Sequence, residues 1–136
     1  MRIFLDANIL FSAAKSDGAI RKLIARVLDD GHECWADEFV VTEARRNLNS
    51  KGPGSLRALE ALLARLRIGT QGTGVSTPEF SWLPEKDRPV LAAAIRLRCD
   101  LLVTGDRTHF GMAYGKAFGG VTICSAQLLA DELWTS

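Results

Sequence analysis

Four acidic residues lie where an apolar segment meets a turn or the start of a predicted helix: Asp6, Glu43, Asp87 and Asp106. The first follows the apolar run 3–5, and the last comes just after the apolar run 101–103. Both runs are typical of short buried strands. Sites in open α/β sheets form at the carboxyl ends of the strands. We therefore expect these carboxylates to gather at one edge of a sheet, where they would hold a divalent metal ion.

The other two acids lie on predicted helices, which we place at 37–47 and 85–98. Glu43 adjoins the apolar positions Val40 and Ala44, and Asp87 extends the stripe of Val90 and Leu91 by one turn. Both carboxylates are thus expected near the buried face of their helix. Helices that lean over the carboxyl edge of the sheet would bring all four acids into one pocket.

Each polar residue of this set also has an ordinary structural explanation. Asp6 can hydrogen-bond within a turn, Asp87 can cap its helix, and Glu43 can pair with Arg46 in solvent. Asn8 can cap the helix that follows Asp6, or it can donate its amide to that carboxylate. The interpretation as a metal site depends on the set, because an unpaired carboxylate at the end of a buried strand is costly to desolvate.

Carboxylates that meet in one pocket need a counter-charge. Two like charges about 4 Å apart repel by roughly 1 kcal/mol in water and by about 4 kcal/mol at an effective dielectric constant of 20. Protonation or a hard divalent cation relieves that repulsion. Oxygen ligands, without paired His or Cys, favour Mg²⁺ or Mn²⁺ over Zn²⁺. Such ions support in-line hydrolysis of a phosphodiester.

The net charge of the chain is only +1, so affinity for a polyanion must come from local cations. Arg45 and Arg46 follow Glu43, and Arg107 follows Asp106. These arginines can contact phosphate oxygens or form surface ion pairs, which contribute roughly 0–1 kcal/mol each.

The size and composition of the chain indicate one soluble domain, residues 1–136. Hydrophobic residues make up 47% of the sequence and charged residues 24%, and no apolar run is long enough to span a bilayer. The N-terminus shows no secretory signal, so we expect a cytoplasmic protein that begins at Met1. The cysteines are dispersed and are expected to be reduced core residues. Predicted helices alternate with short apolar strands, which predicts a parallel sheet covered by helices on both faces.

Several further elements are predicted from periodicity and turn signals. Helices are expected at 8–15, at 20–28 and, after a Ser55 cap, at 55–66, and a terminal helix is expected after a Ser125 cap. Asp37 is a possible N-cap of the helix at 37–47. Strands are expected at 2–6, 32–35, 101–104 and 121–123, with weak candidates around Ile68 and Val75. Residues 49–54 are expected to be a flexible turn. Residues 69–78 are expected to be a loop, because the glycines in this segment do not link a clear strand to a helix.

With these positions in place, the chain resembles the PIN-domain ribonucleases, and in particular toxin subunits of the VapC type. The resemblance covers nearly the whole chain and depends on the segments 4–10, 41–46, 87–94 and 100–106, followed by Phe110. The acidic positions of the family fall on the four acids named above, and its accessory polar positions fall on Asn8 and Thr104. The resemblance implies a three-layer α/β/α fold and Mg²⁺- or Mn²⁺-dependent cleavage of RNA. It also implies homodimers and inhibition by a small antitoxin protein.

Some features depart from the family pattern or allow another function. Ala7 stands where many members have a hydroxyl residue, and segment 69–76 has no motif that aligns. Asp100 is expected to be a turn residue at the opposite edge of the sheet, and His109 is expected to form a local hydrogen bond. One competing hypothesis is a PIN-like module that binds RNA or protein without cleavage. A phosphoacceptor receiver domain is disfavoured, because the first strand ends in a lone Asp6 and no Lys follows the last strand.

Overall fold

Short apolar segments of the sequence form the strands of one six-stranded sheet, in the order β3-β2-β1-β4-β6-β5. We analysed a computed structural model, which describes residues 1–70 and 80–134. All neighbouring strands are parallel except β5, which is antiparallel to β6. The strands are β1 (Arg2–Leu5), β2 (Glu33–Asp37), β3 (Arg67–Gly69), β4 (Leu101–Val103), β5 (Ala117–Phe118) and β6 (Val121–Cys124).

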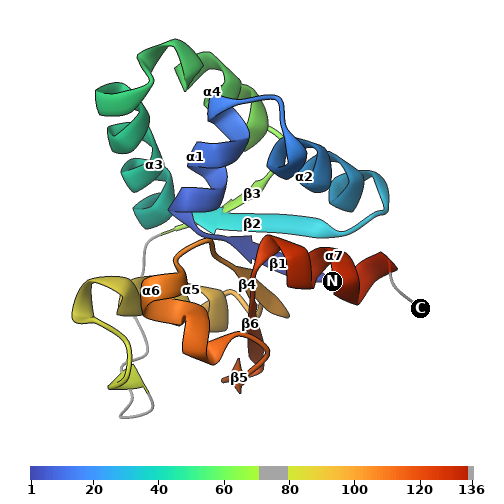
Figure 1. Cartoon of the computed structure of the whole chain (residues 1–136), viewed down its shortest axis with the longest axis vertical. Helices are drawn as coiled ribbons and strands as arrows, with labels where there is room; N and C mark the ends of the chain where they lie inside the picture. Colours follow the sequence, from blue (N-terminus) through green and yellow to red (C-terminus); the bar gives the residue numbers. More distant parts are fainter. Residues whose placement is uncertain (71–79, 135–136) are drawn as a thin grey trace.

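Helices cover both faces of the sheet and give a three-layer α/β/α sandwich, as predicted (Figure 1). In Figure 1, α1 to α4 surround the part of the sheet formed by β2 and β3, while α5 and α6 lie beside β4 and β6. The α-helices are α1 (Ala7–Lys15), α2 (Ala19–Asp29), α3 (Glu38–Lys51), α4 (Leu56–Leu63), α5 (Arg88–Arg96), α6 (Arg107–Phe110) and α7 (Ala126–Trp134). Short 3-10 helices are η1 (Pro53–Ser55), η3 (Glu85–Asp87) and η4 (Gly111–Ala113).

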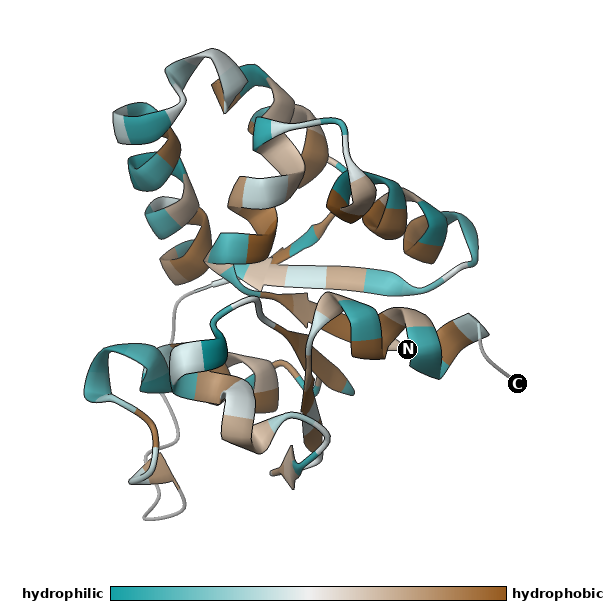
Figure 2. Ribbon diagram, in the orientation of Figure 1, coloured by the Kyte–Doolittle hydropathy of each residue, from teal (hydrophilic) through white to brown (hydrophobic). Residues whose placement is uncertain are grey.

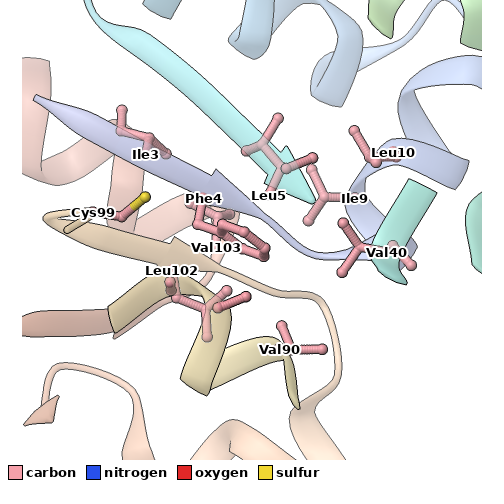
Figure 3. Close-up of a cluster of buried hydrophobic side chains, with 14 of the residues drawn as sticks. Ile3, Phe4, Leu5, Ile9, Leu10, Val40, Val90, Cys99, Leu102 and Val103 are labelled. Carbon is pink, nitrogen blue, oxygen red and sulfur yellow. The ribbon is translucent and has the colours of Figure 1, made fainter. Parts of the chain in front are cut away.

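The central strand β1 is buried on both faces, which explains its uninterrupted apolar sequence. Leu5 lies toward Ile9 and Leu10 of α1, whereas Phe4 lies toward Leu102 and Val103 of β4 (Figure 3). The helices are amphipathic: α3 turns its hydrophobic face inward and its hydrophilic face outward (Figure 2). The core therefore fixes β1 and β4 side by side, with Leu5 paired to Val103.

Two predicted elements have different boundaries in the structure. Helix α3 continues to Lys51, so the segment predicted as a flexible turn at 49–54 is partly helical and is followed directly by η1. The predicted helix 85–98 is divided into η3 and α5, and Asp87 is the last residue of η3, directly before α5. Pro89 accounts for this break, because proline lacks an N–H and is accepted only in the first turn of a helix.

Local capping also differs in part from the predictions. Asp37 caps α3 by accepting from the Val40 N–H at 3.1 Å, and Ser125 Oγ accepts from the Leu128 N–H at 3.1 Å, both as predicted. Ser55, in contrast, makes no side-chain cap bond. The short strand β5 was not predicted, because two residues carry no periodic signal. The candidate strand at Val75 lies outside the described residues.

The three cysteines are buried and free, which confirms their prediction as reduced core residues. Burial raises the pKa of the thiols of Cys34, Cys99 and Cys124 to about 12. Among the helices that the structure describes, none is both long enough and apolar enough to cross a membrane.

Candidate metal centre at the carboxyl end of the sheet

Asp6 lies at the point where β1 passes into α1, and it is the most buried acid of the predicted set, with 6% of its surface exposed. Its Oδ1 accepts from the Ala7 N–H at 2.7 Å, so this carboxylate caps α1. Its Oδ2 accepts from the Thr104 hydroxyl at 2.8 Å and from the Asn8 amide at 3.3 Å. The side chain is thus held by three donors, and its position is fixed by two neighbouring strands.

Thr104 follows β4 and connects Asp6 to the next acid along that edge. Its hydroxyl donates to Asp6 and accepts from the Asp106 N–H at 3.2 Å. The phenol of Tyr114 donates to the Thr104 carbonyl at 2.9 Å, which holds the same residue from the other side. Asn8 completes the group, because its Oδ1 accepts from the Gly105 N–H at 2.8 Å. Asn8 therefore bridges the ends of β1 and β4 and does not cap α1.

Asp87 and Asp106 meet through the imidazole of His109. The Nδ1 atom of His109 lies 2.8 Å from Asp87 Oδ2 and 2.8 Å from Asp106 Oδ2. One ligand atom from each of the three residues lies within 4.8 Å of the other two. His109 Nδ1 and Asp87 Oδ2 are shielded from solvent, and neither is aligned with a partner for a hydrogen bond. The imidazole and the two carboxylates are therefore placed as possible ligands of one cation.

The electrostatic state of the acids reflects burial and mutual repulsion. Burial, together with smaller contributions from the negative charges of Glu43 and Asp87, raises the pKa of Asp6 to about 6, although the hydrogen bonds from Thr104 and Ala7 act to lower it. Burial also raises the pKa of Asp87 above its ordinary value, with a contribution from the charge of Asp106, although His109 and Lys86 act to lower it. Asp6, Glu43, Asp87 and Asp106 therefore influence one another across this end of the sheet.

The structure brings most of the predicted site residues together. Asp6, Asn8, Thr104, Asp87 and Asp106 form one connected group. Glu43 lies on the half-buried side of α3, close enough for its charge to act on Asp6. Asp87 makes no cap bond to α5, so the capping explanation for this residue is not supported.

The predicted phosphate-contacting arginines are in different situations. Arg45 makes two hydrogen bonds with Glu60 of α4, at 2.8 and 3.0 Å, and this ion pair fixes its guanidinium there. Arg107 lines an open pocket of about 350 Å³ together with Asn8, Thr104 and Tyr114. Arg107 thus lies beside two residues that hold Asp6, whereas the charge of Arg45 on α3 is paired with Glu60. Arg46 is exposed on α3.

Two residues were not assigned to the site from the sequence. His109 was expected to form only a local hydrogen bond, but it also contacts Asp87, which is distant in sequence. Its spacing of three from Asp106 is the one signal that would have indicated a shared helix face. Tyr114 carried no signal, because its contact with Thr104 depends on the path of η4. Asp100 behaves as predicted: it accepts from the Arg2 N–H at 2.8 Å, at the start of β1 and thus at the opposite edge of the sheet.

The donor set suits a divalent cation. Carboxylate oxygens with a neighbouring imidazole nitrogen are ordinary ligands for such ions. Asp87 Oδ2 and His109 Nδ1 are shielded from solvent and lie 2.8 Å apart, which is close to the distance between two ligands of one ion. We conclude that the residues present fit a divalent metal ion.

A family model of the PIN domain matches residues 2–108, and the chain belongs to the PIN-domain family. A search among curated protein sequences found no match. Solved structures with the same fold include VapBC2 from Rickettsia felis, crystallised with a DNA fragment from its promoter (16% identity, 92% of this chain and 98% of that chain, TM-score 0.66). VapBC-1 from nontypeable Haemophilus influenzae also matches (15% identity, 93% and 99%, TM-score 0.59).

A third structure with this fold is VapC20 from Mycobacterium tuberculosis, a toxin that cleaves the sarcin-ricin loop. It is 14% identical and aligns with 78% of this chain and 92% of its own, with a TM-score of 0.53. At these identities the likeness establishes the fold, and the family is established by the match over residues 2–108.

Proposed function

We propose that this protein is a metal-dependent endoribonuclease that hydrolyses RNA phosphodiester bonds and serves as the toxin of a VapC-type toxin-antitoxin pair. The observation that carries the proposal is the convergence of Asp6, Asp87 and Asp106 at one edge of a PIN fold, where burial and the charges of neighbouring acids raise the pKa values of Asp6 and Asp87. A module that only binds RNA or protein does not need carboxylates grouped in this way.

In this proposal Asp6, Glu43, Asp87 and Asp106 hold Mg²⁺ or Mn²⁺. The bound ion would supply positive charge that stabilises the phosphate and the leaving oxygen during in-line hydrolysis. Thr104 and Asn8 position the Asp6 carboxylate through the hydrogen bonds described above. Water adds across the scissile bond, so that its oxygen joins phosphorus while the bond from phosphorus to the ribose oxygen breaks.

The surroundings of the acids are suited to a polyanionic substrate. Arg107 follows Asp106 in the chain and borders an open pocket together with Asn8 and Thr104, which hold Asp6, so we assign its guanidinium to a phosphate oxygen near the scissile bond. Arg46 is a second, exposed candidate on the helix that carries Glu43. Arg45 is the least suited of the predicted contacts, because its guanidinium is already paired with Glu60.

The biological context is part of the same proposal. Two of the similar structures are VapBC assemblies and a third is a VapC toxin, which supports a small antitoxin protein as partner of this chain. We further propose that the chain is a single PIN domain, acts as a homodimer and works in the cytoplasm. An antitoxin that reaches the acids would offer a cation to them, as an arginine does in bidentate pairing with carboxylates.

The proposal is tested by incubating the purified protein with total cellular RNA and with purified tRNA in Mg²⁺, in Mn²⁺ and in EDTA. We expect discrete cleavage products with either metal and none in EDTA. The Asp6→Asn protein is the control for a contaminating nuclease, and it should cut no RNA while remaining folded by circular dichroism. Equal cleavage by this variant would refute the site, and RNA binding without cleavage under all conditions would favour the binding module.

A further inference from the structure

The imidazole of His109 occupies the centre of the acidic group and is not accounted for by the acids alone. Its Nδ1 atom is 2.8 Å from one oxygen of Asp87 and 2.8 Å from one oxygen of Asp106. Adjacent ligands of an octahedral ion lie about 3 Å apart when each is about 2.1 Å from the metal. The nitrogen and the two oxygens already have nearly this spacing.

The position of His109 is set by the fold. Its backbone N–H donates to Asp106 Oδ1 at 3.2 Å, which directs the other oxygen of Asp106 to the imidazole. The next residue, Phe110, is fully buried and packs edge-on against Trp82, with ring centres 6.2 Å apart. The turn of α6 is thereby anchored in the core. His109 is thus preorganised beside the carboxylates.

The contacts of Nδ1 fit an ion pair with the two carboxylates, and they also fit shared ligation of a metal ion. Nδ1 and Asp87 Oδ2 are shielded from solvent, and the geometry for a hydrogen bond between them is poor although the atoms lie 2.8 Å apart. The lone pairs of an imidazole nitrogen and a carboxylate oxygen repel at this distance unless an ion lies between them, which is the arrangement of two ligands of one metal ion.

We propose that His109 Nδ1 is a direct ligand of the divalent ion, so that this centre has mixed oxygen and nitrogen ligands and selects Mn²⁺ over Mg²⁺. The inference rests on the proposed function, because it concerns the ion of that same site. Mg²⁺ is bound almost entirely by oxygen, whereas imidazole is a good ligand for transition ions. A nitrogen ligand therefore adds affinity for Mn²⁺ and adds little for Mg²⁺.

The direct test is pulsed electron paramagnetic resonance on the intact protein with Mn²⁺ alone. The chain has two histidines, His32 and His109, so labelling with ¹⁵N-histidine leaves few possible sources of nitrogen coupling. We expect a directly bound histidine nitrogen in the wild-type protein, with a coupling that changes on ¹⁵N labelling. The coupling should vanish in His109→Gln and persist in the matched control His32→Gln, whose ring lies 3.1 Å from the N-terminal amine at the opposite edge of the sheet.

Binding constants give a second measure. Glutamine replaces the nitrogen by an amide oxygen of similar reach, so His109→Gln should bind Mn²⁺ at least about 10-fold more weakly. Mg²⁺, measured by competition, should change by less than about 3-fold. The preference for Mn²⁺ should therefore fall several-fold, and His32→Gln should retain the wild-type ratio.

Bound Mn²⁺ without histidine coupling in the wild-type protein would overturn the inference, and this measurement does not depend on whether the variant folds. An unchanged Mn²⁺ to Mg²⁺ ratio in a folded His109→Gln protein would also overturn it, as would the absence of Mn²⁺ binding. Cleavage of RNA is measured separately. RNA cleavage without nitrogen coupling would leave the proposed function intact, while nitrogen coupling without cleavage would remove the nuclease and leave the ligand assignment standing.

Discussion

The two ends of the parallel sheet both carry acidic residues, but the neighbours of these residues differ. At the amino end, Asp100 accepts a backbone N–H from Arg2, and Glu33 lies 3.7 Å from Arg2 and 3.3 Å from Arg67. The guanidinium of Arg2 also stacks on Trp35 at 4.2 Å. At the carboxyl end, the acids face one another around a single imidazole. This contrast fits the proposal that the charges at the amino end are structural, whereas the grouped acids at the carboxyl end bind a metal ion.

Asp37 strengthens the comparison, because it lies at the carboxyl edge and is nevertheless compensated. Burial raises its pKa, but the carboxylate accepts from the Val40 N–H and lies 3.9 Å from Arg96. An acid at this edge is therefore not sufficient to form the site. The acids proposed to bind metal are those whose neighbours are other acids.

The largest expected effect is on the rate of RNA cleavage, which should fall for a substitution at the carboxyl end of the sheet and not for one at the amino end. Asp106→Asn keeps the oxygen that accepts from the His109 N–H but removes the charge, and we expect RNA cleavage to fall by about 10²–10³-fold or more. Asp100→Asn keeps the acceptor for Arg2 at the amino end and should cleave within about twofold of wild type. Initial rates on one RNA substrate in Mn²⁺ provide the measurement. Equal losses of RNA cleavage in the two variants would contradict a functional difference between the two ends of the sheet.

The second-largest expected effect is on how the free energy of unfolding changes with pH in the absence of metal. The folded pKa of Asp6 is about 6 against an ordinary 3.8, so between these values the folded protein holds a proton that the unfolded chain releases. The free energy of unfolding must then fall as pH rises through this window, by up to about 3 kcal/mol from this group. Asp6→Asn does not titrate there. We expect urea unfolding in EDTA to show the variant gaining up to about 3 kcal/mol relative to wild type between pH 4 and pH 7.5.

Asn makes weaker hydrogen bonds than Asp at this position, and this loss of stability is the same at both pH values. The change in the stability difference between pH 4 and pH 7.5 therefore reports the titration of Asp6. If the difference between variant and wild type is the same at pH 4 and at pH 7.5, Asp6 is ionised in the folded protein without cost. The carboxyl end would then be as well compensated as the amino end.

Metal should stabilise the protein through the carboxyl end alone. A ligand that binds only the folded state at about 100 times its Kd adds about 2.7 kcal/mol, which for a domain of this size raises Tm on the order of 10 °C. We expect this increase with Mn²⁺ for the wild type and for Asp100→Asn. Asp6→Asn and Asp106→Asn should lose most of it. Thermal scans with and without Mn²⁺ measure the shift, and a full shift in both of the latter variants would place the metal elsewhere.

Much of the fold and part of the site were predictable from sequence, because local signals coincide with tertiary demands there. The strand-ending positions of Asp6 and Asp106 follow from apolar runs that stop abruptly, and parallel pairing then requires their ends to meet. The break before α5 was missed, because the stripe through Val90 and Leu91 continues across Asp87 although Pro89 ends its regular geometry.

The remainder depends on contacts between distant segments. His109 joins Asp87 only because α6 and η3 lie together, and a single histidine in a turn has no periodic signal. Arg45 was a reasonable phosphate contact until α4 placed Glu60 against it. Such pairings are decided by packing angles between helices, which hydrophobic periodicity constrains only loosely.

The smallest expected effect is a change in the free energy of unfolding that has opposite signs at the two ends. It tests the comparison most directly, because the same Glu→Gln substitution is made at both ends. Glu33→Gln at the amino end keeps the acceptor for the Trp35 indole but removes an exposed ion pair, which should cost roughly 0.5 kcal/mol or less. Glu43→Gln at the carboxyl end removes a charge that raises the Asp6 pKa, so in EDTA at pH 7.5 it should stabilise by a similar amount. Urea unfolding under matched salt measures both, and high salt should shrink both. If Glu43→Gln destabilises the protein as Glu33→Gln does, then Glu43 stabilises the metal-free fold as a structural residue, and its charge is not explained by the binding of an ion.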